Sequence, residues 1–184
     1  MQLFADHFPP DERARNFDYY ERITVRDSSL SACTEAVAAA DAGHLHLAFD
    51  YAAEAALVDL HDLHGNTSDG LHMASLAGTW LAFVMGFGGL RDLGESLMFN
   101  PRLPEELVRL AFSIRHRGRC LRVDVTRQTA TYVLTRGTGV INVTHHGEQL
   151  AVGGEPVARP IPPAAERPAP KQPEGREPRH RRPQ

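Results

Sequence analysis

The sequence has little cysteine, since Cys33 and Cys120 are its only two in 184 residues. Two cysteines so far apart make neither a disulfide framework nor a zinc-binding pattern. Long apolar runs are also lacking, because the longest, from about residue 71 to 87, is broken by polar side chains and is too short to span a membrane. The N-terminus is acidic and has no basic-then-apolar signal peptide. These absences favour a soluble cytoplasmic protein, or part of one, without membrane association.

An excess of positive charge is absent too. Lys and Arg total 20 and Asp and Glu total 23, so the net charge is −3 and steering toward nucleic acid by overall charge is not expected. Residues 159–184 differ, with eight prolines, a net charge of +4 and almost no large apolar side chains. Such a segment buries too little apolar surface to offset its ordering entropy, which predicts a disordered, solvated tail. Contact of the tail with nucleic acid or an acidic surface is the less favoured alternative.

The first half of the chain has a helical pattern. Helices are predicted over about 10–20, 29–42, 44–62 and 71–86. Pro9 and Pro10 with the acids that follow mark the first start. Residues 27–29, Asp-Ser-Ser, offer three candidate caps for the second helix, and Gly43 marks its end. The fourth helix is apolar nearly all round, which is typical of a helix buried in a larger assembly. That assembly is either an oligomer, such as a homodimer, or a longer polypeptide.

The second half switches to a period of two. Apolar residues alternate along runs around 110–114, 121–125, 132–134, 140–143 and 150–152, with glycines between them. Short strands separated by glycine turns indicate an antiparallel sandwich. The sequence His116-Arg117-Gly118 predicts a tight hairpin turn.

Several longer motifs are more specific. They are Asp27-Ser28-Ser29-Leu30-Ser31, Asn66-Thr67-Ser68-Asp69-Gly70-Leu71-His72, Gly86-Phe87-Gly88-Gly89 and Phe99-Asn100-Pro101-Arg102. Their order over about residues 3–158 resembles the C-terminal part of glycoside hydrolase family 65, which contains maltose, trehalose and kojibiose phosphorylases and related hydrolases. The resemblance implies an α+β chain: the last helices of an (α/α)6 catalytic barrel (1–90), a C-terminal antiparallel β-sandwich (91–158) and the disordered tail (159–184).

The resemblance also implies that the active site is divided between this chain and the part of the enzyme upstream of it. The general acid, a glutamate, and most of the sugar-binding segments of the family lie upstream of this chain, so no catalytic residue is expected here. The phosphate side can be carried over and comprises Ser28, Ser29, Gly70 and His72, with Arg26 as an added candidate. Helix starts with hydroxyl groups suit an anion, and a charged histidine donates two hydrogen bonds. Arg26 could bind phosphate bidentately or form a scaffold ion pair, and the sequence favours neither.

The implied function is a portion of an inverting phosphorylase or hydrolase that acts on an α-linked glucose disaccharide of the trehalose, maltose or kojibiose type. No cofactor is expected, with inorganic phosphate as co-substrate. Serines at the loop where hydrolytic relatives carry a carboxylate base favour phosphorolysis. The alternatives are an inactive fragment, a subunit that completes the barrel with an upstream chain, or a carbohydrate-binding module on the sandwich.

A metal site is the weaker interpretation of the histidines. His61 and His64 have i, i+3 spacing, but the nearby Asp59 and Asp62 are explained by a solvated helix face. No metal ion is predicted, and a catalytic carboxylate pair among Glu54, Asp59 and Asp62 is disfavoured.

Overall fold

The computed structural model describes residues 8–92, 96–163, 167–168 and 170–179. The chain divides into two compact units: a helical unit (1–86 with 165–184) and a β-unit (87–164). Each is considered by itself. In the described ranges, no helix is long and apolar enough to cross a bilayer.

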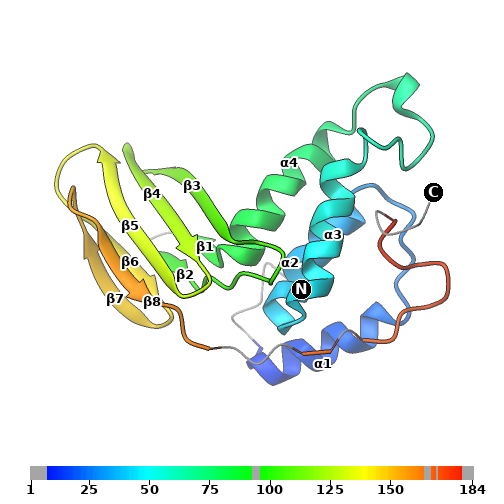
Figure 1. Cartoon of the computed structure of the whole chain (residues 1–184), viewed down its shortest axis with the longest axis horizontal. Coiled ribbons are helices and arrows are strands. Elements are labelled where there is room, and N and C mark those ends of the chain that lie inside the picture. The colour runs from blue at the N-terminus through cyan, green and yellow to red at the C-terminus, as the bar shows by residue number, and fades with distance from the viewer. Residues whose placement is uncertain (1–7, 93–95, 164–166, 169, 180–184) are drawn as a thin grey trace. The chain divides into compact units, whose positions relative to one another are not determined.

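The helical unit contains the four predicted helices. They are α1 (Pro10–Glu21), α2 (Ser31–Ala42), α3 (Leu45–Leu57) and α4 (Met73–Leu81), with a short 3-10 turn η2 (Thr67–Asp69) and a π-helical continuation of α4, η3 (Ala82–Phe87) (Figure 1). Gly43 ends α2 with φ of 91°, a left-handed conformation that favours glycine. The third helix is shorter than predicted, because residues 58–64 form turns. Its predicted core positions Leu47, Tyr51, Ala55 and Val58 are buried.

The predicted cap of α2 is wrong in detail. Leu30, not one of the three preceding polar residues, occupies the cap position, and no side chain in the described part of the chain caps the helix. Residues 28–31 instead close a turn, in which the Ser31 N–H donates to the Ser28 carbonyl at 3.0 Å. The Ser28 hydroxyl accepts from the Leu30 N–H at 3.2 Å. Because of this turn, α2 begins only at Ser31, and Ser28 and Ser29 lie in the loop before it.

Helices α2 and α4 pack closely because small residues face each other. A Cβ placed on Gly78 would meet Cys33 Sγ and lie 2.8 Å from Cys33 Cβ. Further along, a Cβ on Gly86 would lie 3.6 Å from Ala40 Cβ and from Val37 Cα. Later residues of one segment thus face later residues of the other, so the two helices run parallel and begin at the same end of the unit.

Gly78→Ala is expected to destabilise the helical unit by about 1–3 kcal/mol, the usual cost of overpacking. Its new methyl would collide with the Cβ of Cys33, which cannot rotate away without moving a helix. Gly86→Ala is the matched control, since its methyl would make ordinary contacts. Thermal unfolding followed by circular dichroism should separate the two variants, and equal stabilities would contradict this packing.

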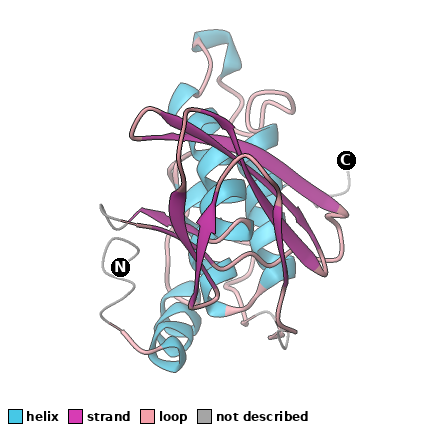
Figure 2. Ribbon diagram, turned by 90° about the vertical axis from the view of Figure 1, so that its left-hand side faces the viewer, coloured by secondary structure: helices cyan, strands magenta, loops and turns pink. Residues whose placement is uncertain are grey.

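The β-unit consists of two four-stranded sheets, in the orders β1-β2-β6-β7 and β3-β4-β5-β8 (Figure 2). The strands are β1 (Leu90–Asp92), β2 (Leu97–Phe99), β3 (Arg109–His116), β4 (Arg119–Thr126), β5 (Thr129–Arg136), β6 (Ile141–His145), β7 (Glu148–Val152) and β8 (Val157–Pro160). Alternating residues of β4 and β5 are buried, as the period of two predicts. Phe99 and Tyr132, from different sheets, lie 5.2 Å apart between ring centroids in this core.

The hairpin prediction is confirmed, while the strand directions need one correction. Arg117 and Gly118 form a two-residue turn with φ of 49° and 78°, and His116 pairs with Arg119. However, β2 pairs with β6 in parallel, so the sheets are not purely antiparallel. A strand of three residues shows too little alternation to be recognised, and its pairing partner lies far along the chain.

Part of the segment predicted to be disordered has a defined place in the structure. Residues 157–160 form strand β8 beside β5. In Figure 1 the red part of the chain lies beside α1 and the loop that follows it, in the helical unit. There the Arg167 N–H donates to the Gly43 carbonyl at 3.0 Å. Composition indicates only how much apolar surface a segment can bury, whereas these residues are held by polar contacts.

Candidate functional site

The predicted phosphate residues come from two loops. Arg26, Ser28 and Ser29 precede α2, and Gly70 and His72 precede α4. Because these helices run parallel through the contact of Cys33 with Gly78, both loops lie at one end of the helical unit. The structure therefore brings the two motifs to the same end.

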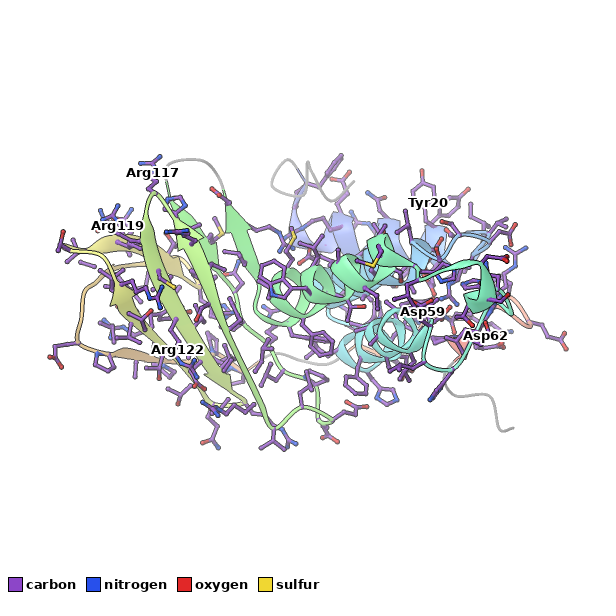
Figure 3. The ribbon with its side chains drawn as sticks, turned by 90° about the horizontal axis from the view of Figure 1, so that it is seen from above. Tyr20, Asp59, Asp62, Arg117, Arg119 and Arg122 are labelled. Carbon is purple, nitrogen blue, oxygen red and sulfur yellow. The ribbon has the colours of Figure 1, made fainter. Side chains whose placement is uncertain are left out.

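His72 is held by a carboxylate that follows α3. Asp59 Oδ1 pairs with His72 Nδ1 at 2.6 Å, and Asp59 Oδ2 accepts from the His72 N–H at 2.9 Å. The hydrogen bond from His72 lowers the pKa of Asp59. Among described residues, Nε2 of His72 has no hydrogen-bond partner, and it is the ring atom left for a ligand, to which it donates when the imidazole is protonated. Figure 3 shows Asp59 and Asp62 at the end of the unit that also carries Tyr20.

The other predicted ligands differ in availability. The Ser28 hydroxyl accepts from the Leu30 N–H, and a hydroxyl in that role can still donate its own hydrogen. Ser29 is partly exposed. Gly70 is exposed and has φ of 132°, but its N–H already donates to the Thr67 carbonyl at 3.2 Å. The hydroxyl groups and His72 are thus better placed to donate to an anion than the Gly70 amide.

Arg26 is surrounded by protein acceptors. Its Nε donates to Glu35 Oε2 at 2.7 Å and its Nη2 to Glu54 Oε2 at 2.6 Å. Its Nη1 donates to the Arg176 carbonyl at 2.7 Å, and its Cζ lies 4.4 Å from the Tyr51 ring centroid. Three nitrogens of the guanidinium are thereby engaged. Of the two roles that the sequence leaves open, these contacts favour the scaffold ion pair.

The arginine belongs to a larger buried group, which we term the Arg26 cluster: Glu21, Arg26, Glu35, Tyr51 and Glu54. The buried Tyr51 hydroxyl donates to Glu21. Burial works against the charged form of Arg26, but the hydrogen bond and charge of Glu54 outweigh it and raise the arginine's pKa. Burial, together with the Glu21 charge, raises the pKa of Tyr51. Within the cluster, Glu35 and Glu54 thus pair with Arg26, whereas Glu21 accepts from the Tyr51 hydroxyl.

Burial also raises the pKa of Glu35 to about 7, against the lowering effect of Arg26. In the folded state Glu35 therefore keeps its proton to a higher pH than in the unfolded chain, where its pKa has the ordinary value of 4.5. As the pH rises from about 4.5 to 7, the free energy of unfolding should therefore fall by about 3 kcal/mol, at about 1.36 kcal/mol per pKa unit.

Glu35→Gln isolates that contribution, because glutamine does not titrate. Denaturant unfolding at pH 5 and pH 8 should show a smaller loss of stability in the variant than in the parent chain. Asp59 and Asp62 do not obscure the comparison, since their lowered pKa values place their effect below pH 4. An unchanged difference between the two pH values would contradict the protonation of Glu35.

Sequence reasoning missed two parts of this end of the unit. Asp59 lies 13 residues before His72, across turns whose path no periodicity reveals. The tail residue Arg179, far along the chain, also reaches it, and Gln172 contacts the Arg26 cluster. The described residues contain no cluster of three or more His, Cys, Asp or Glu side chains that could hold a metal ion.

Two family models match the chain. The glycosyl hydrolase family 65 central catalytic domain matches residues 1–81, and the family 65 C-terminal domain matches residues 90–152. The chain belongs to glycosyl hydrolase family 65. It corresponds to a C-terminal part of the family's proteins, as the order of its motifs predicts.

Individual proteins and a solved structure are also similar to this chain. An uncharacterized glycosyl hydrolase of Mycobacterium tuberculosis is 52% identical and covers 99% of this chain, which spans 24% of that protein. An alpha,alpha-trehalose phosphorylase of Thermoanaerobacter brockii is 42% identical over 74% of the chain and 18% of its own length. A solved structure assigned as a kojibiose phosphorylase from the human microbiome has a TM-score of 0.79 and 25% identity over 86% of this chain and 22% of its own. The chain thus spans about a quarter of the length of the curated relatives it matches most fully.

Proposed function

We propose that this chain forms the phosphate side of the active site of an inverting family 65 phosphorylase that acts on an α-linked glucose disaccharide in the cytoplasm. The observation that carries the proposal is the pairing of His72 with Asp59 at the start of α4. This pair fixes the imidazole and leaves Nε2 to a ligand. The hydroxyls of Ser28 and Ser29 lie in the loop at the same end of the unit.

The chemistry of these groups suits an anionic nucleophile. An inverting glycosidase that uses water needs a carboxylate base to activate it, besides the general acid. Phosphate carries its own negative charge, so it needs donors that hold it in line rather than a base. Hydroxyls, an imidazole and helix-start amides are such donors. The general acid would come from the upstream part of the enzyme, as the resemblance implies.

An exposed apolar stripe on α4 supports completion of the site by the upstream polypeptide. Met73, Leu76 and Trp80 follow a helical spacing and are 67%, 36% and 48% exposed. Within α4 only Ser75 and Gly78 are buried, although the helix is mostly apolar. We propose that α1–α4 are the last helices of a six-pair barrel whose preceding helices cover this stripe.

Trp80, the only tryptophan of the chain, reports on that contact. Its fluorescence emission is expected to shift to shorter wavelength when the separately prepared upstream polypeptide is added, because the indole leaves water. Subtracting the same titration with a Trp80→Phe chain removes the signal of upstream tryptophans. An emission maximum that stays unchanged while the two pieces co-purify would contradict this location of the interface.

The proposed activity is tested with the complete polypeptide, comprising this chain and the upstream part. Trehalose, maltose and kojibiose are each supplied with inorganic phosphate, and glucose 1-phosphate is quantified. One of the three should be cleaved at least 10-fold faster than the others. Cleavage of none, by a folded preparation, would overturn the assignment of the substrate class.

A further inference from the structure

The tail segment from residue 167 to 179 follows the helical unit from one end to the other. It begins at the Gly43 carbonyl, beyond the end of α2, where the Arg167 N–H donates to it. Its described residues end beside the loop that leads to α4, where Arg179 Nη1 donates to the Leu63 carbonyl at 3.1 Å. Both family models end before this segment, so neither assigns it a role.

Polar contacts fix the segment in the middle of its path. Gln172 Nε2 donates to Glu21 Oε1 and to the Tyr51 hydroxyl, both at 2.6 Å. The Arg176 carbonyl accepts from Arg26, and Arg176 Nη1 donates to the Thr24 carbonyl at 2.8 Å. Each contact satisfies a buried or partly buried group that would otherwise be costly to desolvate. The segment is therefore an integral part of the Arg26 cluster's surroundings.

The contacts of Arg179 bring a cation to the end of the helical unit that carries Ser28, Ser29 and His72. The Arg179 backbone N–H donates to Glu54 Oε2 at 3.1 Å, which fixes the residue independently of its side chain. Arg179 Nη1 also lies 3.3 Å from His64 Nδ1. The His64 and His72 rings are 5.6 Å apart between centroids, so the three side chains form one continuous group.

Arg179 brings a permanent positive charge to this group. Burial lowers the pKa of His64, and the charges of Arg179 and His72 lower it further. The facing negative groups are already engaged, Glu54 by Arg26 and Asp59 by His72. Among the described residues, Nε and Nη2 of Arg179 make no hydrogen bond. A guanidinium with two such nitrogens suits bidentate binding of an oxyanion.

We propose that Arg179, carried by the tail, is a phosphate-binding residue of the same site as His72, with His64 placed between them. This inference rests on the proposed phosphorolytic function. It makes the segment 167–179 a part of the active site rather than a solvated extension. The ligand is inorganic phosphate or the phosphate group of the sugar phosphate product.

The test measures binding of inorganic phosphate to the complete polypeptide by isothermal titration calorimetry. Arg179→Gln should weaken binding about 10-fold, and Arg179→Lys should recover part of the loss because it keeps the charge. Arg167→Gln is the matched control: this arginine lies in the same tail, at the other end, and among the described residues its side chain pairs only with the exposed Asp11. It should bind phosphate like the parent protein.

The outcomes separate the two proposals. Unchanged binding by Arg179→Gln, together with weakened binding by His72→Ala, would overturn the role of Arg179 and leave the proposed function intact. A parent protein that binds no phosphate would overturn both. Equal losses in Arg179→Gln and Arg179→Lys, with a lowered melting temperature in each, would assign the residue to tail docking and overturn its role as a ligand.

Discussion

Replacing Arg26 with alanine is expected to lower the free energy of unfolding of the helical unit by about 3–5 kcal/mol, the usual cost of removing one partner of a buried ion pair. The side chain is 9% exposed and pairs with Glu35 and Glu54, which are 13% and 10% exposed. Without the guanidinium, Glu54 would be left with no cation inside the Arg26 cluster, and Glu35 would lose the charge that favours its ionised form. The loss should appear in denaturant unfolding followed by circular dichroism at neutral pH.

Arg167→Ala is the control for this effect, since Arg167 and Asp11 are 44% and 81% exposed. Exposed pairs contribute about 0–1 kcal/mol, so this variant should be close to the parent chain. If Arg26→Ala were as stable as Arg167→Ala but bound phosphate poorly, Arg26 would be a ligand rather than a scaffold residue. That result would reverse the choice between the two roles that the sequence leaves open.

Replacing His72 with alanine is expected to lower kcat/KM for phosphate about 100-fold in the complete polypeptide, measured below the unfolding temperature of the variant. A hydrogen bond to a charged group contributes about 1.5–3 kcal/mol, which corresponds to a 10- to 150-fold effect. Asp59→Asn should give a smaller loss of about 10-fold, because it keeps the imidazole but removes the carboxylate that orients it.

Asp62→Asn is the matched control for these two variants. Asp62 lies three residues after Asp59, and its Oδ1 accepts from the Thr67 N–H at 3.1 Å rather than from His72. Asparagine retains a carbonyl oxygen for that bond, so kcat/KM for phosphate should stay near the parent value. Should His72→Ala alter the KM for the disaccharide and not that for phosphate, the assignment of His72 to the phosphate side would be wrong.

Local signals in the sequence were sufficient for most of the fold. Gly43 ends α2 because glycine adopts its left-handed conformation easily, and Arg117-Gly118 makes a hairpin for the same reason. Strands β3, β4 and β5 are long enough, at eight residues each, to show their alternation. The three-residue strands β1 and β2 are not, and their partners are set by tertiary packing.

The candidate site was only partly predictable. The motif resemblance selected Ser28, Ser29 and His72, and helix packing explains why their loops lie at one end. The choice between two roles for Arg26 depended on which acceptors surround it, and those come from α2, α3 and the tail. Gln172 and Arg179 carry no local signal, because a proline-rich segment held by polar contacts has the same composition as a solvated one.

The most direct test of the account is the product that the complete polypeptide forms from its preferred disaccharide, followed by proton NMR with and without inorganic phosphate. We expect β-glucose 1-phosphate in the presence of phosphate, because attack on an α-linked glucose with inversion gives the β anomer, and no cleavage in its absence. Release of free glucose at a rate independent of phosphate would contradict it and identify water as the nucleophile.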